Sequence, residues 1–161
     1  MKLVKLANCP RFAMVDSKDF CRVNRFKWYL QPNGAVARCK RIGGASRTIY
    51  LHRFVVGHGG ALVDHWDRNK LNNCRKNLRR CGKSENAQNM AKGESALFTS
   101  RFKGVSLIRD MKLKKPWRAG LQKHGRRIFI GYFATQRRAA LAYNEAARLH
   151  FGQFALLNAI A

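Results

Sequence analysis

Residues 61–91 of this 161-residue chain read ALVDHWDRNKLNNCRKNLRRCGKSENAQNMA, and the interpretation of the N-terminal part starts from this segment. A short apolar run ends in Asp64 and His65, and a polar loop follows. Leu78 then begins a second short segment, and a helical pattern runs to about Ala91. The spacing predicts the order strand, loop, strand and helix.

This order of elements brings together side chains that suit phosphodiester hydrolysis. A carboxylate at Asp64 and an amide oxygen at Asn86, on the helix, are ligands for one hard divalent cation, Mg²⁺ first and Mn²⁺ as the alternative. His65 can act as a general base, because an imidazole has an ordinary pKa of about 6.5. Asn77 is expected to tie down the loop through its amide. Each of these residue types, taken alone, is most often structural. The hypothesis of a nuclease site therefore rests on the spacing of all four residues.

The charge of the chain points to a polyanionic partner. Lys and Arg number 33 against 8 Asp and Glu, a net charge of +25. The excess is +14 over residues 1–91 and +11 over residues 92–161, so both halves are expected to face the same polyanion. We expect double-stranded DNA, with an anionic membrane surface as the rival interpretation.

Several classes of protein are disfavoured by composition. No apolar run approaches the roughly 18 residues of a membrane span. The N-terminus lacks a long apolar segment, so we expect a cytoplasmic protein, in the host cell if phage-encoded, and not a secreted one. Five cysteines without a Cys-x-x-Cys pair favour free thiols, with a zinc site at Cys74 and Cys81 as the lesser alternative.

Turn signals organise the first 50 residues as a small strand-rich region. Asn33-Gly34 predicts a hairpin between strands at 27–30 and 35–39. Gly43-Gly44 marks a further turn before the apolar segment 48–51.

Residues 101–161 predict a three-stranded antiparallel sheet packed on one C-terminal helix. Strands are expected at 104–109, 117–123 and 126–132, with a turn at His124-Gly125. Thr135 should cap a helix that Gly152 ends. Alternation places Ala119 on the face toward the helix. The opposite face would carry basic, polar and aromatic side chains that suit the DNA major groove: Arg118, Gly120, Gln122, Arg127 and Phe129.

Several short segments of the chain carry a family resemblance. These are Val63-Asp64-His65, the Asn72-Asn73 pair, Asn77-Leu78-Arg79, and then Asn86 and Asn89. In these segments the chain resembles the HNH homing endonucleases. The resemblance implies a ββα-metal nuclease fold. It also implies that His65 is the general base, that Asp64 and Asn86 bind the metal, and that Asn77 constrains the loop. Asn86 stands where the last letter of the motif implies His. Upstream, His52 is interpreted as a packing or phosphate-facing residue.

The C-terminal part resembles the Apetala/ethylene-response-factor DNA-binding domain. The similarity covers about residues 100–158, through Phe102-Lys103-Gly104-Val105, Ile130-Gly131-Tyr132-Phe133 and the alanine-rich helix. It implies reading of the major groove by the sheet. The expected DNA-binding residues are Lys103, Ser106, Arg109, Arg118, Gln122, Arg127 and Phe129.

Together these observations predict an α+β protein with an HNH nuclease domain at 1–91 (core about 50–91), a linker at 92–100 and a DNA-binding domain at 101–161. We expect a site-specific endonuclease of homing type from a mobile element or phage, monomeric and without an obligate protein partner. The alternatives are a non-catalytic DNA-binding regulator with a decayed nuclease domain, or a basic RNA-binding protein.

Overall fold

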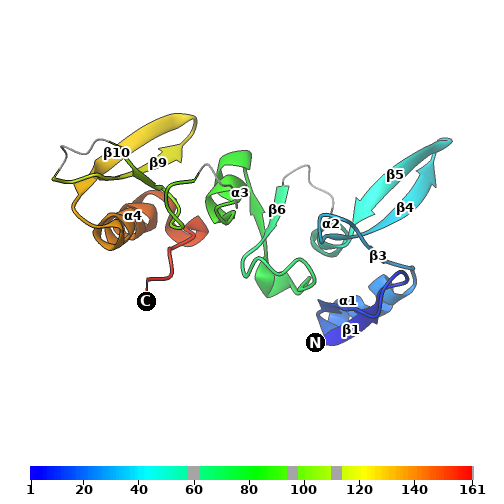
Figure 1. Ribbon diagram of the computed structural model, residues 1–161. Helices are drawn as coiled ribbons and strands as arrows, with labels where there is room; N and C mark the ends of the chain where they lie inside the picture. Colours follow the sequence, from blue (N-terminus) through cyan, green and yellow to red (C-terminus); the bar gives the residue numbers. More distant parts are fainter. Residues whose placement is uncertain (58–61, 94–97, 110–113, 161) are drawn as a thin grey trace. The chain divides into compact units, whose positions relative to one another are not determined.

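The computed structural model describes residues 1–57, 62–93, 98–109 and 114–160. The chain is a mixed α+β protein built from small antiparallel sheets and short helices (Figure 1). It divides into two compact units, Met1–Gly82 and Lys83–Ala161. Each unit has hydrophobic clusters of its own.

Three small sheets and two helices form the first unit. The strand β1 pairs with β2, β4 lies between β3 and β5, and β6 pairs with β7. The bounds are β1 (Lys2–Lys5), β2 (Phe12–Val15), α1 (Ser17–Asn24), β3 (Tyr29–Leu30), β4 (Val36–Ile42), β5 (Ala45–Tyr50), α2 (Leu51–Val56), β6 (Leu62–His65), the 3-10 turn η1 (Arg75–Asn77) and β7 (Leu78–Cys81).

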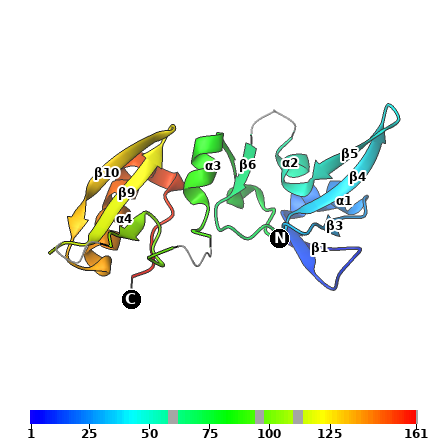
Figure 2. The same cartoon turned by 45° about the horizontal axis from the view of Figure 1, so that its top comes forward.

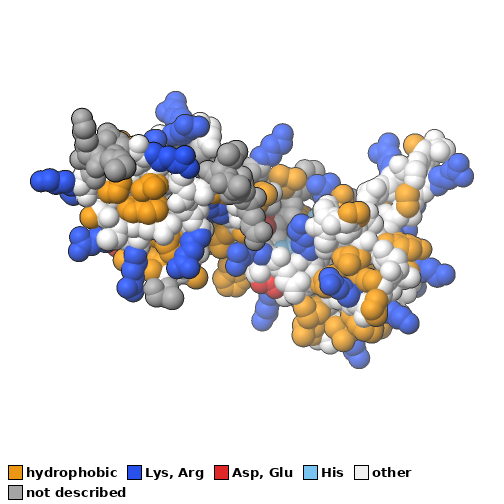
Figure 3. All heavy atoms as spheres, viewed as in Figure 1, with side chains coloured by type: hydrophobic (Ala, Val, Ile, Leu, Met, Phe, Trp, Pro, Cys, Tyr) orange, Lys and Arg blue, Asp and Glu red, His pale blue; other side chains and the backbone are white. Residues whose placement is uncertain are grey.

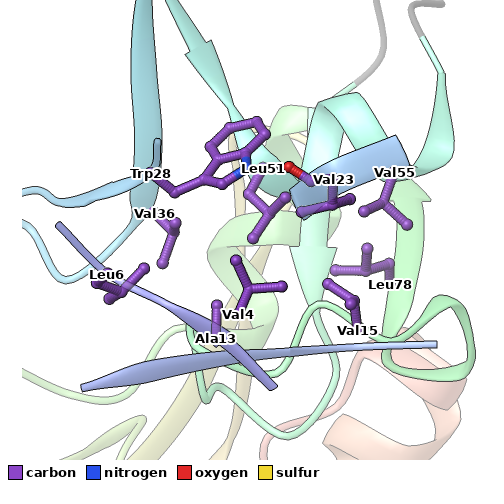
Figure 4. Packing of buried hydrophobic residues seen from close by; sticks show 10 residues of the cluster. All are labelled: Val4, Leu6, Ala13, Val15, Val23, Trp28, Val36, Leu51, Val55 and Leu78. Carbon is purple, nitrogen blue, oxygen red and sulfur yellow. Dashed lines mark hydrogen bonds between the residues drawn. The ribbon is translucent and has the colours of Figure 1, made fainter. Parts of the chain in front are cut away.

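The core of this unit forms where β1, β2, α1 and α2 turn their apolar sides inward (Figure 4). Side chains alternate along a strand, so β2 buries Ala13 and Val15, and β1 buries Val4 between two exposed residues. Trp28 is fully buried, and its indole nitrogen donates to the carbonyl of Val23 at 2.9 Å. Leu78 belongs to the same cluster, which anchors β7 to this core.

The predicted turns of the first unit are confirmed. Strands β3 and β4 pair around Asn33-Gly34, and Gly34 has a φ of +79° that glycine adopts without strain. Gly43 and Gly44 form the two-residue connection between β4 and β5, because Ile42 is paired with Ala45. The predicted strand at 61–64 begins at Leu62 in the structure, and Ala61 lies outside the described residues.

The second unit begins with a short helix and contains the predicted three-stranded sheet. The strands pair antiparallel in the order β10-β9-β8, and α4 packs against them (Figure 2). The bounds are α3 (Lys83–Asn89), β8 (Val105–Leu107), β9 (Trp117–Lys123), β10 (Arg126–Phe133), α4 (Gln136–Phe151) and the 3-10 turn η2 (Gly152–Phe154).

Helix α4 has the predicted ends. The Thr135 hydroxyl accepts a hydrogen bond from the Arg138 amide at 3.2 Å, and Gly152 follows the last residue with a φ of +52°. Buried alanines let the helix lie close to the sheet. One close approach is at Gly104, just before β8, where a β-carbon would lie 2.2 Å from the Tyr143 ring.

The first unit ends at Gly82 and the second begins at Lys83, and the linker at 92–100 stays a prediction. Helix α3 lies in the second unit, where the Lys103 ammonium donates to the carbonyls of Gln88 and Met90 at 2.6 and 2.7 Å. Such a cation satisfies carbonyls that a helix end leaves without partners. Within the predicted linker, the Lys92 ammonium donates to the Ser100 carbonyl at 2.6 Å, and residues 94–97 lie outside the described residues.

All five cysteines are free thiols. Among the described residues, no helix has both the length and the apolar character that a bilayer crossing requires.

Candidate functional site

The candidate site is built on the β6–β7 hairpin, whose register sets the positions of its side chains. Asp64 pairs with Arg79 and His65 with Leu78, so Asp64 and His65 lie at the loop end of β6. Both side chains are buried, with 9% and 6% exposure. The hairpin therefore holds an acid and an imidazole side by side in the sequence, at the place where the long loop begins.

A network around Asn77 closes this loop. The Asn77 amide nitrogen donates to the Asp67 carboxylate and to the Asn72 carbonyl, both at 2.8 Å. Its amide oxygen accepts from the Asp67 backbone nitrogen at 3.0 Å. The backbone nitrogen of Trp66 also donates to the Asn77 carbonyl, at 2.9 Å. One side chain thus connects the start, the middle and the end of the loop.

The same loop is attached to the strands and helix that precede it. Met14 donates to the Leu71 carbonyl and accepts from the Asn73 nitrogen, both at 2.8 Å. Arg75 forms an ion pair with the buried Asp19, at 2.7 Å from its Nε and 2.9 Å from its Nη2. Proximity of that guanidinium lowers the pKa of Asp19. The loop is therefore held from within and from the strand-rich region.

The imidazole of His65 faces Asn73. Its Nε2 lies 3.4 Å from the amide oxygen of Asn73, which is itself 1% exposed. The amide nitrogen of Asn73 donates to the Lys70 carbonyl at 3.2 Å, and this bond sets which end of the amide faces the ring. Because an amide oxygen only accepts, the contact places the proton of neutral His65 on Nε2 and the lone pair on Nδ1.

Burial keeps this imidazole uncharged. The pKa of His65 is lowered chiefly by desolvation, against the opposing effects of Asn73, Asp67 and Asp64. Next to it, His52 stacks on Tyr50 at 5.4 Å between ring centroids and meets the His65 ring edge-on at 5.2 Å. Burial, and then the neighbouring His65, lower the pKa of His52 to about 4. Both imidazoles are therefore neutral near pH 7.

Arg79 orients the carboxylate of Asp64. Its Nε and Nη2 donate to the same oxygen, Oδ2, at 3.0 and 2.8 Å. Both side chains are largely shielded from solvent, which strengthens the pair. The site thus combines an imidazole, an oriented carboxylate and a guanidinium within one hairpin.

Comparison with known proteins bears on this arrangement. The chain is 31% identical over 156 residues to a protein named an uncharacterised HNH endonuclease from Acanthamoeba polyphaga mimivirus. The match covers 92% of this chain and 75% of the relative. This chain belongs to the HNH endonuclease family. No protein-family model matches it, and no solved structure matches it significantly.

In this HNH endonuclease family member, the residue predicted to complete the metal site lies outside the β6–β7 hairpin. Asn86 is on α3 and is half-buried. Carboxylate and amide oxygens, the donors of Asp64 and Asn86, are chemically suited to a hard divalent cation. Within the described ranges, no group of three or more His, Cys, Asp or Glu side chains is arranged to hold a metal. The ligand pair therefore stays a prediction.

The second unit brings most of the predicted DNA-binding residues to one face. In the sheet, Ser106 pairs with Arg118 and Gln122 pairs with Arg127. All four are exposed, as is Phe129, whose ring lies 5.7 Å from the Arg118 guanidinium. This set of five is called the sheet face below. It is polar, basic and aromatic, and it lies opposite the surface that packs on α4.

Two of the predicted DNA-binding residues lie elsewhere. Lys103 is half-buried, and its ammonium is engaged with the carbonyls at the end of α3. Arg109 is exposed in the segment after β8, immediately before residues 110–113, which are outside the described part of the chain. Lys and Arg side chains occur over the visible surfaces of both units, and acidic ones are sparse there (Figure 3).

Three residues of the site received no role from the sequence. Asn73 and Arg79 stood in the motif, but their partners depend on loop geometry and strand register. Asp67 accepts from Asn72 and Asn77, and these hydrogen bonds help to lower its pKa although burial raises it. The excess of amide residues between 69 and 77 was the available signal for such a network.

Proposed function

We propose that this chain is a DNA endonuclease of homing type that hydrolyses phosphodiester bonds. The observation that carries the proposal is the buried, neutral imidazole of His65 at the end of β6, with its tautomer set by Asn73 and an oriented acid, Asp64, beside it. The name of the mimivirus relative, an HNH endonuclease, supports the same chemistry.

In this proposal His65 is the general base and accepts a proton from water at Nδ1. Its lowered pKa keeps the base unprotonated near neutral pH, which a proton acceptor requires. Asn73 holds the ring through Nε2, and Asn77 holds the loop that carries Asn73. The base is thereby positioned before the substrate arrives, which lowers the entropic cost of reaction.

Asp64 and Asn86 are the proposed ligands of one divalent metal ion, Mg²⁺ or alternatively Mn²⁺. Such an ion, when bound, supplies positive charge that offsets the charge developing on the phosphate and the leaving oxygen. Arg79 keeps the Asp64 carboxylate in one orientation.

Double-stranded DNA is the proposed substrate, and the net charge of +25 supports it. The sheet face of the second unit is proposed to dock in the major groove, as in the Apetala/ethylene-response-factor type of domain. Its exposed guanidinium groups, polar side chains and Phe129 suit contacts with phosphates and base edges. Arg109 is proposed to add a contact at one side of the sheet.

The test is digestion of supercoiled plasmid with and without Mg²⁺. Wild-type protein should nick or cut the plasmid only with the metal, and His65→Ala should abolish cleavage while binding a duplex with unchanged affinity. His150→Ala, on α4, is the matched control and should cut normally. Undiminished cleavage by His65→Ala would refute the assignment of the base. Binding without any cleavage by wild-type protein would favour a non-catalytic regulator.

A further inference from the structure

Strands β4 and β5 of the first unit form a hairpin that continues past the third strand of their sheet (Figure 1). Strand β3 pairs only with the start of β4, where Leu30 faces Val36 and Tyr29 faces Ala37. Farther along, in the described part of the chain, β4 pairs only with β5. We call residues 39–48 the basic hairpin. Every residue of the basic hairpin is exposed.

Cations are concentrated on this hairpin without acids to balance them. Lys40 and Arg47 are directly opposed in the register, so they share one face. Arg41 lies on the other face, opposite Ser46. Like charges directly across two strands destabilise the pair. No Asp or Glu occurs in the sequence between Asp19 and Asp64, so nearby sequence offers no compensating charge.

The base of the hairpin is anchored in the protein. Ala37 is fully buried, and the Arg38 guanidinium lies over the Phe26 ring at 3.8 Å from its centroid. That ring packs edge-on against Phe54 at 5.7 Å. The hairpin therefore projects from a packed support, so its end holds a defined direction within the first unit.

The tip is narrow. Gly43 and Gly44 both have positive φ values, +56° and +80°, as a tight two-residue hairpin turn requires. Among the described residues, no heavy atom beyond the adjacent ones lies within 4 Å of a β-carbon built at either position, so the turn is open on that side. A glycine tip adds no side chains to the width of the ribbon. Cationic side chains stand behind it at the visible end of β4 and β5 (Figure 3).

We propose that the basic hairpin is a second DNA-docking element, separate from the sheet face, and that its end enters the major groove of duplex DNA. The inference rests on the proposed function in taking duplex DNA as the substrate. The groove is about 12 Å wide and 8.5 Å deep, and it admits a two-stranded ribbon. Three residues per strand beyond Cys39 and Thr48 extend about 10 Å, which matches that depth.

The phosphates of the groove walls are the proposed partners of the three cations. Lys40 and Arg47 project from one face of the ribbon and Arg41 from the other, so both walls can be contacted. Binding of phosphates would relieve the repulsion between Lys40 and Arg47. This arrangement explains why like charges are opposed in a stretch of sequence that contains no acidic residue.

The experiment measures binding of the full-length protein to a mixed-sequence 30-base-pair DNA duplex in EDTA, over a range of salt concentrations. The test variant is Lys40→Gln/Arg41→Gln/Arg47→Gln. The control is Lys5→Gln/Lys18→Gln/Arg25→Gln, which removes the same charge from exposed positions elsewhere in the first unit. A second test variant joins Cys39 to Thr48 through Gly-Gly, which shortens the ribbon and keeps its base.

We expect the hairpin variants to reduce the slope of log affinity against log salt by about 2 to 3, and the affinity on the order of 100-fold at 0.1 M salt. The control should lose much less affinity, and its salt dependence should change much less. Melting temperatures of the hairpin variants should equal or exceed that of wild type, because a repulsive pair is removed.

Equal losses in the hairpin variant and the control would overturn the inference, because they would show an effect of net charge alone. An equal loss on single-stranded DNA or duplex RNA would overturn the assignment to the major groove. The assay needs no cleavage, so an inactive nuclease leaves it intact. Wild-type protein that cuts plasmid while the hairpin variants bind as the control does would overturn this inference alone.

Discussion

Arg79 lies directly across the β6–β7 hairpin from Asp64 and donates to its Oδ2 from both Nε and Nη2, at 3.0 and 2.8 Å. The carboxylate proposed to hold a metal is therefore oriented by its cross-strand neighbour. Two residues that are 15 positions apart in the chain form an ion pair through the register of four residues per strand. The contacts of Asn73 and Asn77 depend in the same way on the loop between these strands.

Replacing Arg79 should damage both the fold and the proposed activity. Arg79→Ala leaves a largely buried carboxylate without its ion pair, and we expect a loss of about 2 to 3 kcal/mol in the free energy of unfolding. Arg80→Ala, at the exposed next position, should change it by less than about 0.5 kcal/mol. Urea denaturation at pH 7 measures both. Equal stability of the two variants would show that the pair does not hold the hairpin.

Asn73 should control the acid limb of the pH profile of cleavage. The pKa of His65 is already lowered, so wild-type activity should fall only as pH drops below 6.5. The Asn73 hydrogen bond raises that pKa, so Asn73→Ala should move the limb to lower pH. Asn73→Asp should move it to higher pH, since a carboxylate favours the imidazolium. Plasmid nicking from pH 5 to 8 gives the profiles. If the acid limbs of Asn73→Ala and Asn73→Asp shifted to the same side of the wild-type limb, the positioning role of Asn73 would be contradicted.

His52 should make the fold sensitive to mild acid. Its pKa falls from 6.5 to about 4 on folding, chiefly by burial, so the unfolded chain takes up the proton first. The stability that depends on neutral His52 is complete above pH 6.5 and is lost as pH falls toward 4, by up to ~3 kcal/mol. His52→Phe keeps a ring there and should flatten this loss. Denaturation at pH 7 and pH 4.5 compares the two proteins. Identical pH dependence would exclude His52 as the source.

Asn77 should be needed for the loop, whatever its effect on cleavage. Asn77→Ala removes three hydrogen bonds, each worth about 1 kcal/mol, so we expect a loss of roughly 2 to 3 kcal/mol in unfolding free energy. Asn24→Ala, at the exposed end of α1, is the control and should be nearly neutral. Thermal and urea unfolding report the difference. A stable Asn77→Ala protein would mean that the strand-rich region alone holds the loop.

Local signals predicted the second unit well. The His124-Gly125 turn, the Thr135 cap and the end of α4 at Gly152 depend on backbone preferences of a few adjacent residues. The face that carries Ala119 is buried as predicted, because alternation along a strand needs no knowledge of the partner. The contact of Lys103 with the end of α3 was not predictable in this way, since Lys103 lies 14 positions beyond Asn89, the last residue of that helix.

The amino-acid sequence by itself determined the order of elements around Asp64 and His65, the turn positions and the strongly basic character, because these follow from neighbouring residues and from composition. Only the tertiary structure decided that Asn73 faces the imidazole, that Arg79 pairs with Asp64 and that Lys103 caps α3. Those contacts join residues that are 8 to 15 positions apart along the chain. Strand register, loop closure and burial bring them together, and a local pattern does not specify any of the three.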